Sequence, residues 1–370
     1  MEAAFGQLLF TFSVNLYKQL LSADSAANAS NLLCSPLTIA AALGMTLAGA
    51  RNNTARQIRA LFVEGISSRS VSSGHPRALD DDDVIHDAFS SIIGSLNYDS
   101  DGMETVSLRF ANRLYASLDV RLAPEYAALV SSSYRASVAN VDFDNDTEAT
   151  RRAINGWVFQ ETASKIAELL PPGSVDSGTC VALVNAVYFR GSWAELFDPE
   201  LTAEEPFYET PTRSRKVKMM YRTGRFAVGR HEGLGVSLVS IPYRNQNVSM
   251  VVLLPHKLDG LDDLEQLMTP SQLSTMINNM SSITKVRLKL PRFKLSTTSD
   301  LRRPLSAMGV TDLFTSRADL SGVTVNRGKP GCGGSPRGAG VSGGPAPSRS
   351  RGDRGRHRGS GRIGFGRHPP

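Results

Sequence analysis

The chain contains few of the residues from which metal centres and disulfide frameworks are built. It has three cysteines and six histidines in 370 residues. Cys34, Cys180 and Cys332 are odd in number and far apart, which excludes a disulfide framework and a C-x-x-C metal site. The histidines form no H-E-x-x-H motif and no H-x-x-x-H pair. We therefore expect Cys34 and Cys180 to be buried thiols, and we expect no metal ion and no cofactor.

Long apolar runs are also absent. No run reaches the roughly 18 apolar residues that a transmembrane helix needs, so no membrane partner is expected. The first twenty residues, MEAAFGQLLFTFSVNLYKQL, contain Glu2 and no basic segment before their apolar part. They do not resemble a standard secretory signal peptide.

An excess of positive over negative charge is absent outside the C-terminal tail. The formal net charge is +6, but residues 325–370 hold ten Lys/Arg and one Asp, which leaves 31 basic and 34 acidic residues in 1–324. The same 46 residues carry 14 of the 32 glycines, six of the 19 prolines and one aromatic residue. Such a segment cannot bury enough apolar surface to fold, so we expect residues 325–370 to be disordered. The basic balance belongs to this tail, and no nucleic-acid partner is expected for the body.

The first half of the chain has helical periodicity. An amphipathic helix is predicted at the start from apolar residues three or four apart, namely Phe5, Leu9, Phe12, Leu16 and Leu20. Ser35 is a plausible N-cap with Pro36 at the first helical position, and this second helix should end near Gly49. Further helices are predicted from Thr54, over residues 84–97, and over 148–169.

A polar stretch separates two of these helices. Residues 66–83 contain four consecutive aspartates and read as an exposed loop. Adjacent aspartates in a loop cannot all converge on one ion, so this run indicates a solvated surface and no metal site.

The second half is rich in strands. CVALVNAVYF at 180–189 is almost wholly apolar, as a strand covered on both faces would be. VSLVSIPY and VSMVVLLP flank residues 244–247 as a hairpin, and KVRLKL at 285–290 alternates like a half-exposed strand. Because helices precede strands without βαβ alternation, we predict one large α+β domain with mainly antiparallel sheets.

Other catalytic motifs and targeting signals carry little weight. The one G-x-S-x-G match, residues 340–344 around Ser342, lies in the glycine-rich tail, where we expect neither the strand nor the helix of a nucleophile elbow. No phosphate-binding glycine loop is present, so an ordinary hydrolase, metalloenzyme or nucleotide-binding enzyme is poorly supported. Sequons that favour a secretory, glycosylated protein occur at Asn28, Asn52, Asn145, Asn247 and Asn279.

Several long segments resemble the serpin family in order and spacing over residues 1–324. They are NLLCSPLTIAAALGMTLAGARNNTARQI (31–58), INGWVFQETASKIAELLPPGSVD (154–176), LVNAVYFRGSWAELFDPELTAEEPFY (183–208), VKMM (217–220), SIPYRNQNVSMVVLLP (240–255), LKLPRFKL (288–295) and LSAMGVTDLFTSRADLSGVT (305–324). The resemblance implies a serpin fold with about nine helices and three mainly antiparallel sheets.

The resemblance also implies a function. Serpins inhibit serine or cysteine proteases as suicide substrates: the protease cleaves an exposed reactive loop, which then inserts as a new strand into the central sheet and distorts the acyl-enzyme. By motif, Ser35 and Asn185 match the shutter where that sheet opens, and Trp193 the breach where insertion begins. From the residues alone, core packing is the favoured explanation for all three. An intact protein of this kind is expected to be an extracellular monomer, although some serpins are intracellular.

The resemblance stops at Thr324. A serpin should continue into a strand, a hinge of small residues, the reactive loop and terminal strands, and residues 325–370 supply neither hinge nor loop. Arginines in a hinge would carry unpaired charge into a packed sheet. The chain as written is therefore expected to be inactive, with uncovered sheet edges that promote aggregation. The target protease and its cleavage site cannot be read.

The tail itself suggests an explanation. Shifted by one base, synonymous codons for residues 351–357 permit Glu-Gly-Thr-Glu-Ala-Ala-Thr, the hinge that the family would require. We interpret residues 325–370 as an out-of-frame reading of the natural C-terminus. Two other functions are alternatives to protease inhibition. The chain could be a non-inhibitory binding protein whose basic tail contacts RNA or acidic glycans, or a hydrolase that uses Ser342.

Overall fold

The computed structural model describes residues 2–24, 31–63, 82–96, 106–179, 181–244, 248–280, 282–293, 301–325 and 341–343. Nine α-helices and nine strands lie in this part of the chain, so the predicted α+β class is confirmed. The helices are α1 (Glu2–Asp24), α2 (Pro36–Gly49), α3 (Asn52–Val63), α4 (Asp82–Leu96), α5 (Pro124–Tyr134), α6 (Thr147–Glu161), α7 (Leu261–Leu267), α8 (Pro270–Asn278) and α9 (Arg302–Ala307). The strands are β1 (Val106–Ser117), β2 (Ser137–Val141), β3 (Val181–Gly191), β4 (Ala203–Thr210), β5 (Arg213–His231), β6 (Val236–Pro242), β7 (Ser249–Pro255), β8 (Ser282–Pro291) and β9 (Val341–Gly343).

The first sheet has the strand order β2-β1-β3-β9. β1 and β3 pair antiparallel along their whole length, and β3 is an inner strand, as its apolar sequence predicted. β2 pairs parallel with β1 and follows it through α5. This β1-α5-β2 unit is a local βαβ crossover, which the sequence analysis did not expect.

The second sheet contains β4 to β8. Its order is β4-β5-β6-β7, and β8 also pairs with β5. The 19 residues of β5 pair in turn with β4, β8 and β6. Because β5 is continuous, the strands in the described residues form two hydrogen-bonded sheets, where the resemblance implied three.

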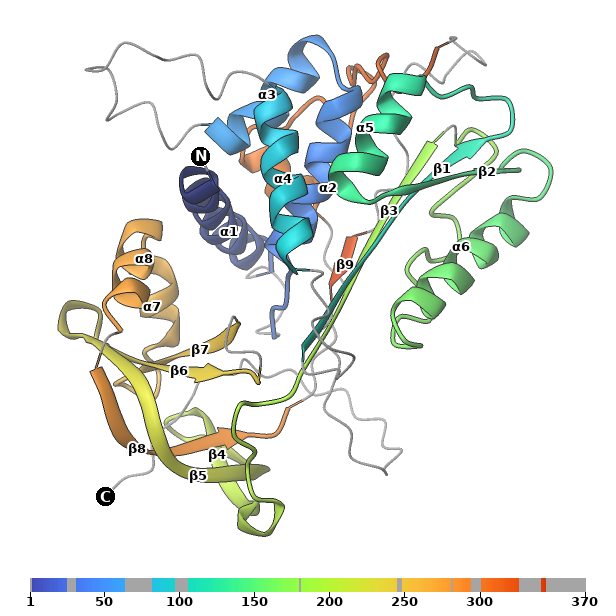
Figure 1. Cartoon of the computed structure of the whole chain (residues 1–370). Coiled ribbons are helices and arrows are strands. Elements are labelled where there is room, and N and C mark those ends of the chain that lie inside the picture. The colour runs from blue at the N-terminus through green and yellow to red at the C-terminus, as the bar shows by residue number, and fades with distance from the viewer. Residues whose placement is uncertain are drawn as a thin grey trace, which may run out of the picture.

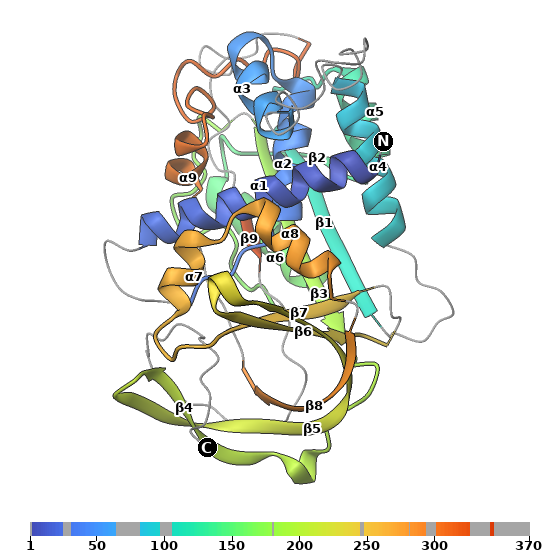
Figure 2. The same cartoon turned by 90° about the vertical axis from the view of Figure 1, so that its left-hand side faces the viewer.

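Helices cover both faces of the first sheet (Figure 1). Leu114 of β1 and Leu183 of β3 join the large core cluster built from α1 to α5. Residues of the opposite parity in β3, such as Ala182 and Val184, pack against Ile154 of α6 on the other face. The second sheet carries α7 and α8 on one side, where Leu264 and Met276 contact β6 and β7 (Figure 2). Among the helices in the described ranges, none is long and apolar enough to cross a membrane.

The helix predictions were largely confirmed, with two exceptions. The apolar stripe of α1 is buried throughout, and α2 has Ser35 as its N-cap and ends at Gly49 as expected. Asp82 and Asp83, assigned to the loop, instead form the first turn of α4, where carboxylates are favoured by the helix dipole. The predicted helix over 148–169 was wrong beyond Glu161, because the next turn contains the left-handed residues Ala163 and Ser164 with φ of 50° and 61°.

The tail departs from expectation at one place. Val341–Gly343 form β9, although residues 325–370 were expected to be disordered throughout. Strand pairing uses backbone groups, which this glycine-rich sequence retains. The body also extends one residue further than predicted, because the backbone N–H of Val325 donates to the Arg121 carbonyl at 3.0 Å.

Candidate functional site

The most distinctive feature of the first sheet is an incompletely paired edge of β3. One edge is fully paired with β1, whereas on the other side only three of the eleven residues of β3 pair with β9 in the described part of the chain. β9 runs parallel to β3, and α2 packs against both strands. Because an open edge presents unpaired backbone donors and acceptors, it can accept a further strand.

The two residues matched to the shutter lie at the start of α2 and within β3. The backbone carbonyl of Ser35 begins α2 by accepting hydrogen bonds from the Ile39 N–H at 3.2 Å and the Thr38 hydroxyl at 3.0 Å. The Ser35 side chain makes no capping hydrogen bond. Asn185 lies in β3, where its backbone is in register with Asn112 on one side and β9 on the other; its side chain lies outside the described part of the structure.

A buried polar network connects β1 of the first sheet to the helices that cover it. The Asn112 side-chain amide of β1 donates to the Tyr134 carbonyl at 3.0 Å, and the Tyr134 hydroxyl lies 2.7 Å from His86 Nδ1. Gly44 of α2 allows this close packing, because a Cβ there would lie 2.4 Å from the Tyr134 hydroxyl oxygen. Burial lowers the pKa of His86 and raises the pKa of Tyr134, so both side chains are neutral near pH 7. The network ties α2, α4 and α5 to β1.

Trp193 joins the two sheets at the end of β3. Its indole stacks on the Tyr243 ring with centroids 4.6 Å apart and planes 10° apart. The backbone N–H of Ala194 donates to the Pro242 carbonyl at 3.0 Å. Gly191 has no room for a side chain, because a Cβ would lie 2.5 Å from Tyr243. Trp193 is therefore a packing anchor where the sheets meet.

Two side chains of α6 hold the segment that follows this helix. The Asn155 carbonyl oxygen accepts from the backbone N–H groups of Leu169 and Leu170 at 3.0 and 2.9 Å, and its amide donates to the Leu170 carbonyl at 2.9 Å. Arg151 donates to the same carbonyl and to Glu148 and Glu168. Its hydrogen bonds lower the pKa of Glu148 and raise that of Arg151 itself. Since α6 packs on β1 and β3, this clamp fixes the cover over one face of the first sheet.

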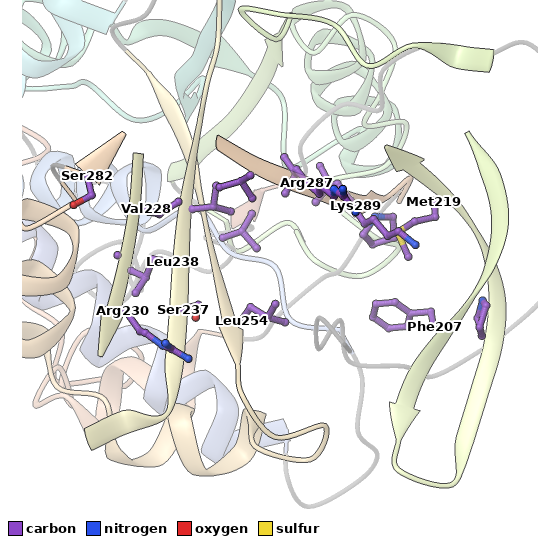
Figure 3. A pocket seen from close by; sticks show the side chains of 18 residues that line it. Phe207, Met219, Val228, Arg230, Ser237, Leu238, Leu254, Ser282, Arg287 and Lys289 are labelled. Carbon is purple, nitrogen blue, oxygen red and sulfur yellow. The ribbon is translucent and has the colours of Figure 1, made fainter. Parts of the chain in front are cut away.

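The second sheet contains a large cavity between β8 and the β6-β7 hairpin (Figure 3). Its volume is about 710 Å³, and its lining comes from β4, β5, β6, β7 and β8. Within the described ranges β7 pairs only with β6, and β8 only with β5. Each of these two strands therefore has one edge without a strand partner among the described residues.

The remaining predicted residues are dispersed. Asn52, Asn145 and Asn279 are exposed on separate elements, whereas Asn28 and Asn247 lie outside the described residues. Burial raises the pKa of the Cys34 thiol to about 11, so it is a poor nucleophile; Cys180 and Cys332 are outside the described part. Ser342 lies in the middle of β9 and not at a strand-to-helix turn, so the backbone there does not form a nucleophile elbow.

Sequence reasoning missed the residues that organise both faces of the first sheet. Asn112, Tyr134 and His86 contact one another across three elements, and Asn155 reaches a loop 14 residues away. The sequence did offer one signal for these residues, namely a polar residue at a position where the periodicity predicts a buried apolar one. A buried amide or imidazole must form hydrogen bonds with some partner. That signal does not say where the partners lie.

Comparison with known proteins agrees with this arrangement. The family model Serpin (serine protease inhibitor) matches residues 8–332, eight residues beyond the end of the predicted resemblance. Iris of Ixodes ricinus is 42% identical over 326 residues, covering 88% of this chain and 81% of that protein. Leukocyte elastase inhibitor of Bos taurus is 37% identical over 319 residues, covering 85% of this chain and 78% of that protein.

Solved structures give the same result. Emu ovalbumin (Dromaius novaehollandiae) superimposes with a TM-score of 0.79 at 31% identity, over 87% of this chain and 82% of that one. A structure described as cleaved Serpin 42Da superimposes with a TM-score of 0.75 at 29% identity, over 88% and 81%. The chain belongs to the serpin family, which is described as a family of serine protease inhibitors and not of enzymes.

Proposed function

We propose that residues 1–325 form the body of a serine or cysteine protease inhibitor that traps its target by accepting a strand at the open edge of β3. The observation that carries this proposal is the pairing of β3 within the part of the chain that the structure describes: it is complete with β1 but limited to three residues of β9 on the other side. A strand that enters there gains a ladder of backbone hydrogen bonds and the apolar support of α2. The name of one relative, leukocyte elastase inhibitor of Bos taurus, supports the same function.

The chain as printed is not expected to inhibit. Inhibition requires a hinge of small residues and a bait loop, and residues 325–370 contain ten basic residues and no such hinge. Entry of arginines beside β3, under the helices that cover this sheet, would place unpaired charges in a packed interior. We therefore propose that the natural product is read in the frame that restores Glu-Gly-Thr-Glu-Ala-Ala-Thr at the position of residues 351–357.

The test compares two proteins. The printed chain and a chain with the C-terminus read in the shifted frame are incubated with trypsin-, chymotrypsin- and elastase-type proteases, and SDS-resistant complexes are counted on gels. We expect complexes from the shifted-frame chain and none from the printed chain. A transcript whose codons do not permit the shifted reading, or a shifted-frame chain that is only cleaved as a substrate, contradicts the proposal.

The tail offers the second candidate function. If the printed chain is the natural product, its cluster of arginines favours binding to RNA or acidic glycans. That function predicts polyanion binding which weakens steeply with salt and disappears on truncation after Thr324.

We also propose that the intact protein is extracellular, glycosylated and monomeric. The exposed sequon residues Asn52, Asn145 and Asn279 support this compartment. Expression in a secreting eukaryotic cell, followed by glycosidase treatment and mass spectrometry, tests it. Retention inside the cell without glycan would refute it.

A further inference from the structure

A second, smaller cavity lies between α6 and the segment that returns beside this helix. The returning segment is held by the Ser164 N–H, which donates to the Phe159 carbonyl at 2.7 Å, and by the bonds of Leu169 and Leu170 to Asn155. Figure 1 shows α6 on the face of the first sheet opposite to α2. This α6 cavity shares no lining residue with the cavity in the second sheet.

The α6 cavity has a volume of about 350 Å³. Its lining consists of Arg151, Arg152, Asn155, Gly156, Phe159, Ala167 and Glu168. Arg152, Gly156 and Phe159 share one face of the helix, because they are four and three residues apart. At 1.5 Å per residue, Arg152 and Phe159 are about 10 Å apart along the helix axis. A Cβ at Gly156 would meet nothing within 4 Å, so the helix surface between them is open.

One end of the α6 cavity has opposite charges on its two walls. Arg152 is exposed and its Nε donates to the Glu148 carbonyl at 3.3 Å; within the described ranges its two terminal nitrogens have no hydrogen-bond partner. On the returning segment, one carboxylate oxygen of Glu168 accepts from Arg151 at 3.0 Å. The other oxygen has no partner among the residues that the structure describes, and about half of this side chain is exposed. Because Glu168 contacts the residue that precedes Arg152, both charges lie at the same end.

The other end of the α6 cavity is apolar. Phe159 is 39% exposed, and its ring lies two helical turns beyond Arg152. A single exposed aromatic residue on a helix is ordinary. A ring that shares a cavity with an available cation and an available anion is more specific, because a ligand can gain from apolar contact at one end and charge pairing at the other.

We propose that the α6 cavity binds a free amino acid with a large apolar side chain. Its carboxylate pairs with Arg152, its ammonium group with Glu168, and its side chain lies over Gly156 against the Phe159 ring. The distance of about 10 Å between the two ends excludes small side chains, which would not reach the ring. Because the ligand contacts both the helix and the returning segment, it also strengthens the attachment of that segment to α6.

The experiment titrates the full chain with L-tryptophan and follows the indole protons by saturation-transfer NMR. For a ligand of this size we expect a Kd of about 1 mM. Tryptophanamide lacks the carboxylate and N-acetyltryptophan lacks the ammonium group, so each should bind about fivefold more weakly, as expected for loss of one exposed ion pair. Alanine lacks the ring and should not bind. Equal affinities of tryptophan, tryptophanamide and N-acetyltryptophan would overturn the proposal.

Protein variants locate the site. Gly156→Leu places a side chain in the open part of the cavity and should abolish tryptophan binding without lowering the Tm. Gly6→Leu is the matched control, because Gly6 is an exposed helix residue whose Cβ would also meet nothing within 4 Å. Tryptophan binding that survives Gly156→Leu would overturn the proposal.

A second variant decides the result if Gly156→Leu lowers the Tm. Arg152→Gln changes only an exposed side chain. It should weaken tryptophan binding about fivefold and leave tryptophanamide binding unchanged, because the amide has no carboxylate to lose a partner. Equal weakening of both ligands would show that Arg152 does not pair with the carboxylate and would refute the assignment.

Discussion

The Asn155 clamp gives the sharpest test of how the first sheet is covered. In Asn155→Ala two backbone N–H groups, those of Leu169 and Leu170, lose their acceptor. Both residues are buried, with 6% and 1% of their surface exposed. An unsatisfied buried donor costs about 1–3 kcal/mol, so the two together cost about 2–6 kcal/mol. The Leu170 carbonyl keeps its bond from Arg151 and adds little to the loss.

The expected value lies at the lower end of that range. A cavity of about 350 Å³ lined by Arg151, Asn155 and Glu168 adjoins the clamp, and water entering the space left by the amide can satisfy part of the lost bonding. We therefore expect a local loss of about 2–3 kcal/mol. Since about 1.4 kcal/mol is a factor of ten, amide exchange of residues 165–170 should accelerate about 30-fold or more.

Hydrogen-exchange mass spectrometry of the wild type and Asn155→Ala measures this directly. Arg152→Ala is the control, because Arg152 is exposed and 4.0 Å from Glu148, and it should change exchange by less than a factor of about two. Unchanged protection of Leu169 and Leu170 in Asn155→Ala would refute the argument that the amide holds this segment.

Three further outcomes are expected. Gly49→Ala should destabilise the fold by about 1–3 kcal/mol in urea denaturation, because its Cβ would lie 2.2 Å from Val323. Gly6→Ala should not destabilise the fold, since nothing lies within 4 Å of a Cβ at that position. Equal urea midpoints of the two variants would contradict this expectation. Burial lowers the folded-state pKa of His86 below its unfolded value near 6.5, so the stability that the neutral imidazole supports is present above pH 6.5 and is lost as pH falls toward the folded pKa. His86→Gln should therefore flatten the plot of unfolding free energy against pH between about pH 7 and 5. An unchanged slope would contradict the role of His86 in this pH dependence. Trp193→Phe should retain the junction better than Trp193→Ala, which should lose about 2–3 kcal/mol of unfolding free energy because the indole is only partly buried; equal stability of the two variants would show that the stack is not an anchor.

Local patterns predicted the elements well where one period extended over several turns. The stripe of α1, the Ser35–Pro36 start of α2 and the alternation of β8 all follow from spacing and cap chemistry that a single segment contains. The end of α6 was not predicted, because Ala163 and Ser164 are not residue types that favour a left-handed backbone. Tertiary hydrogen bonds to the following segment impose that conformation.

Long-range pairing could not be predicted from residue patterns. Strand register, the parallel placement of β2, and the contact between Asn112 and Tyr134 depend on which distant elements meet. The motif match named Ser35, Asn185 and Trp193, yet it did not indicate the Asn155 clamp, because an asparagine in a helix has no sequence neighbour that identifies its partners.

The closure of the helical core has a consequence for synthesis of the chain. That core packs Phe5 of the first helix together with Val323, and the Arg51 N–H is held by the Asp319 carbonyl. The core can therefore be completed only when nearly the whole body has left the ribosome, and it is complete just before Thr324, where the resemblance ends. A frame error after that codon changes no residue of this core, so the product can still complete the helical core once Val323 has left the ribosome. Such a product would leave the ribosome with its helical core formed and its sheets incomplete. Proteases and chaperones that recognise exposed strand edges would then determine its fate.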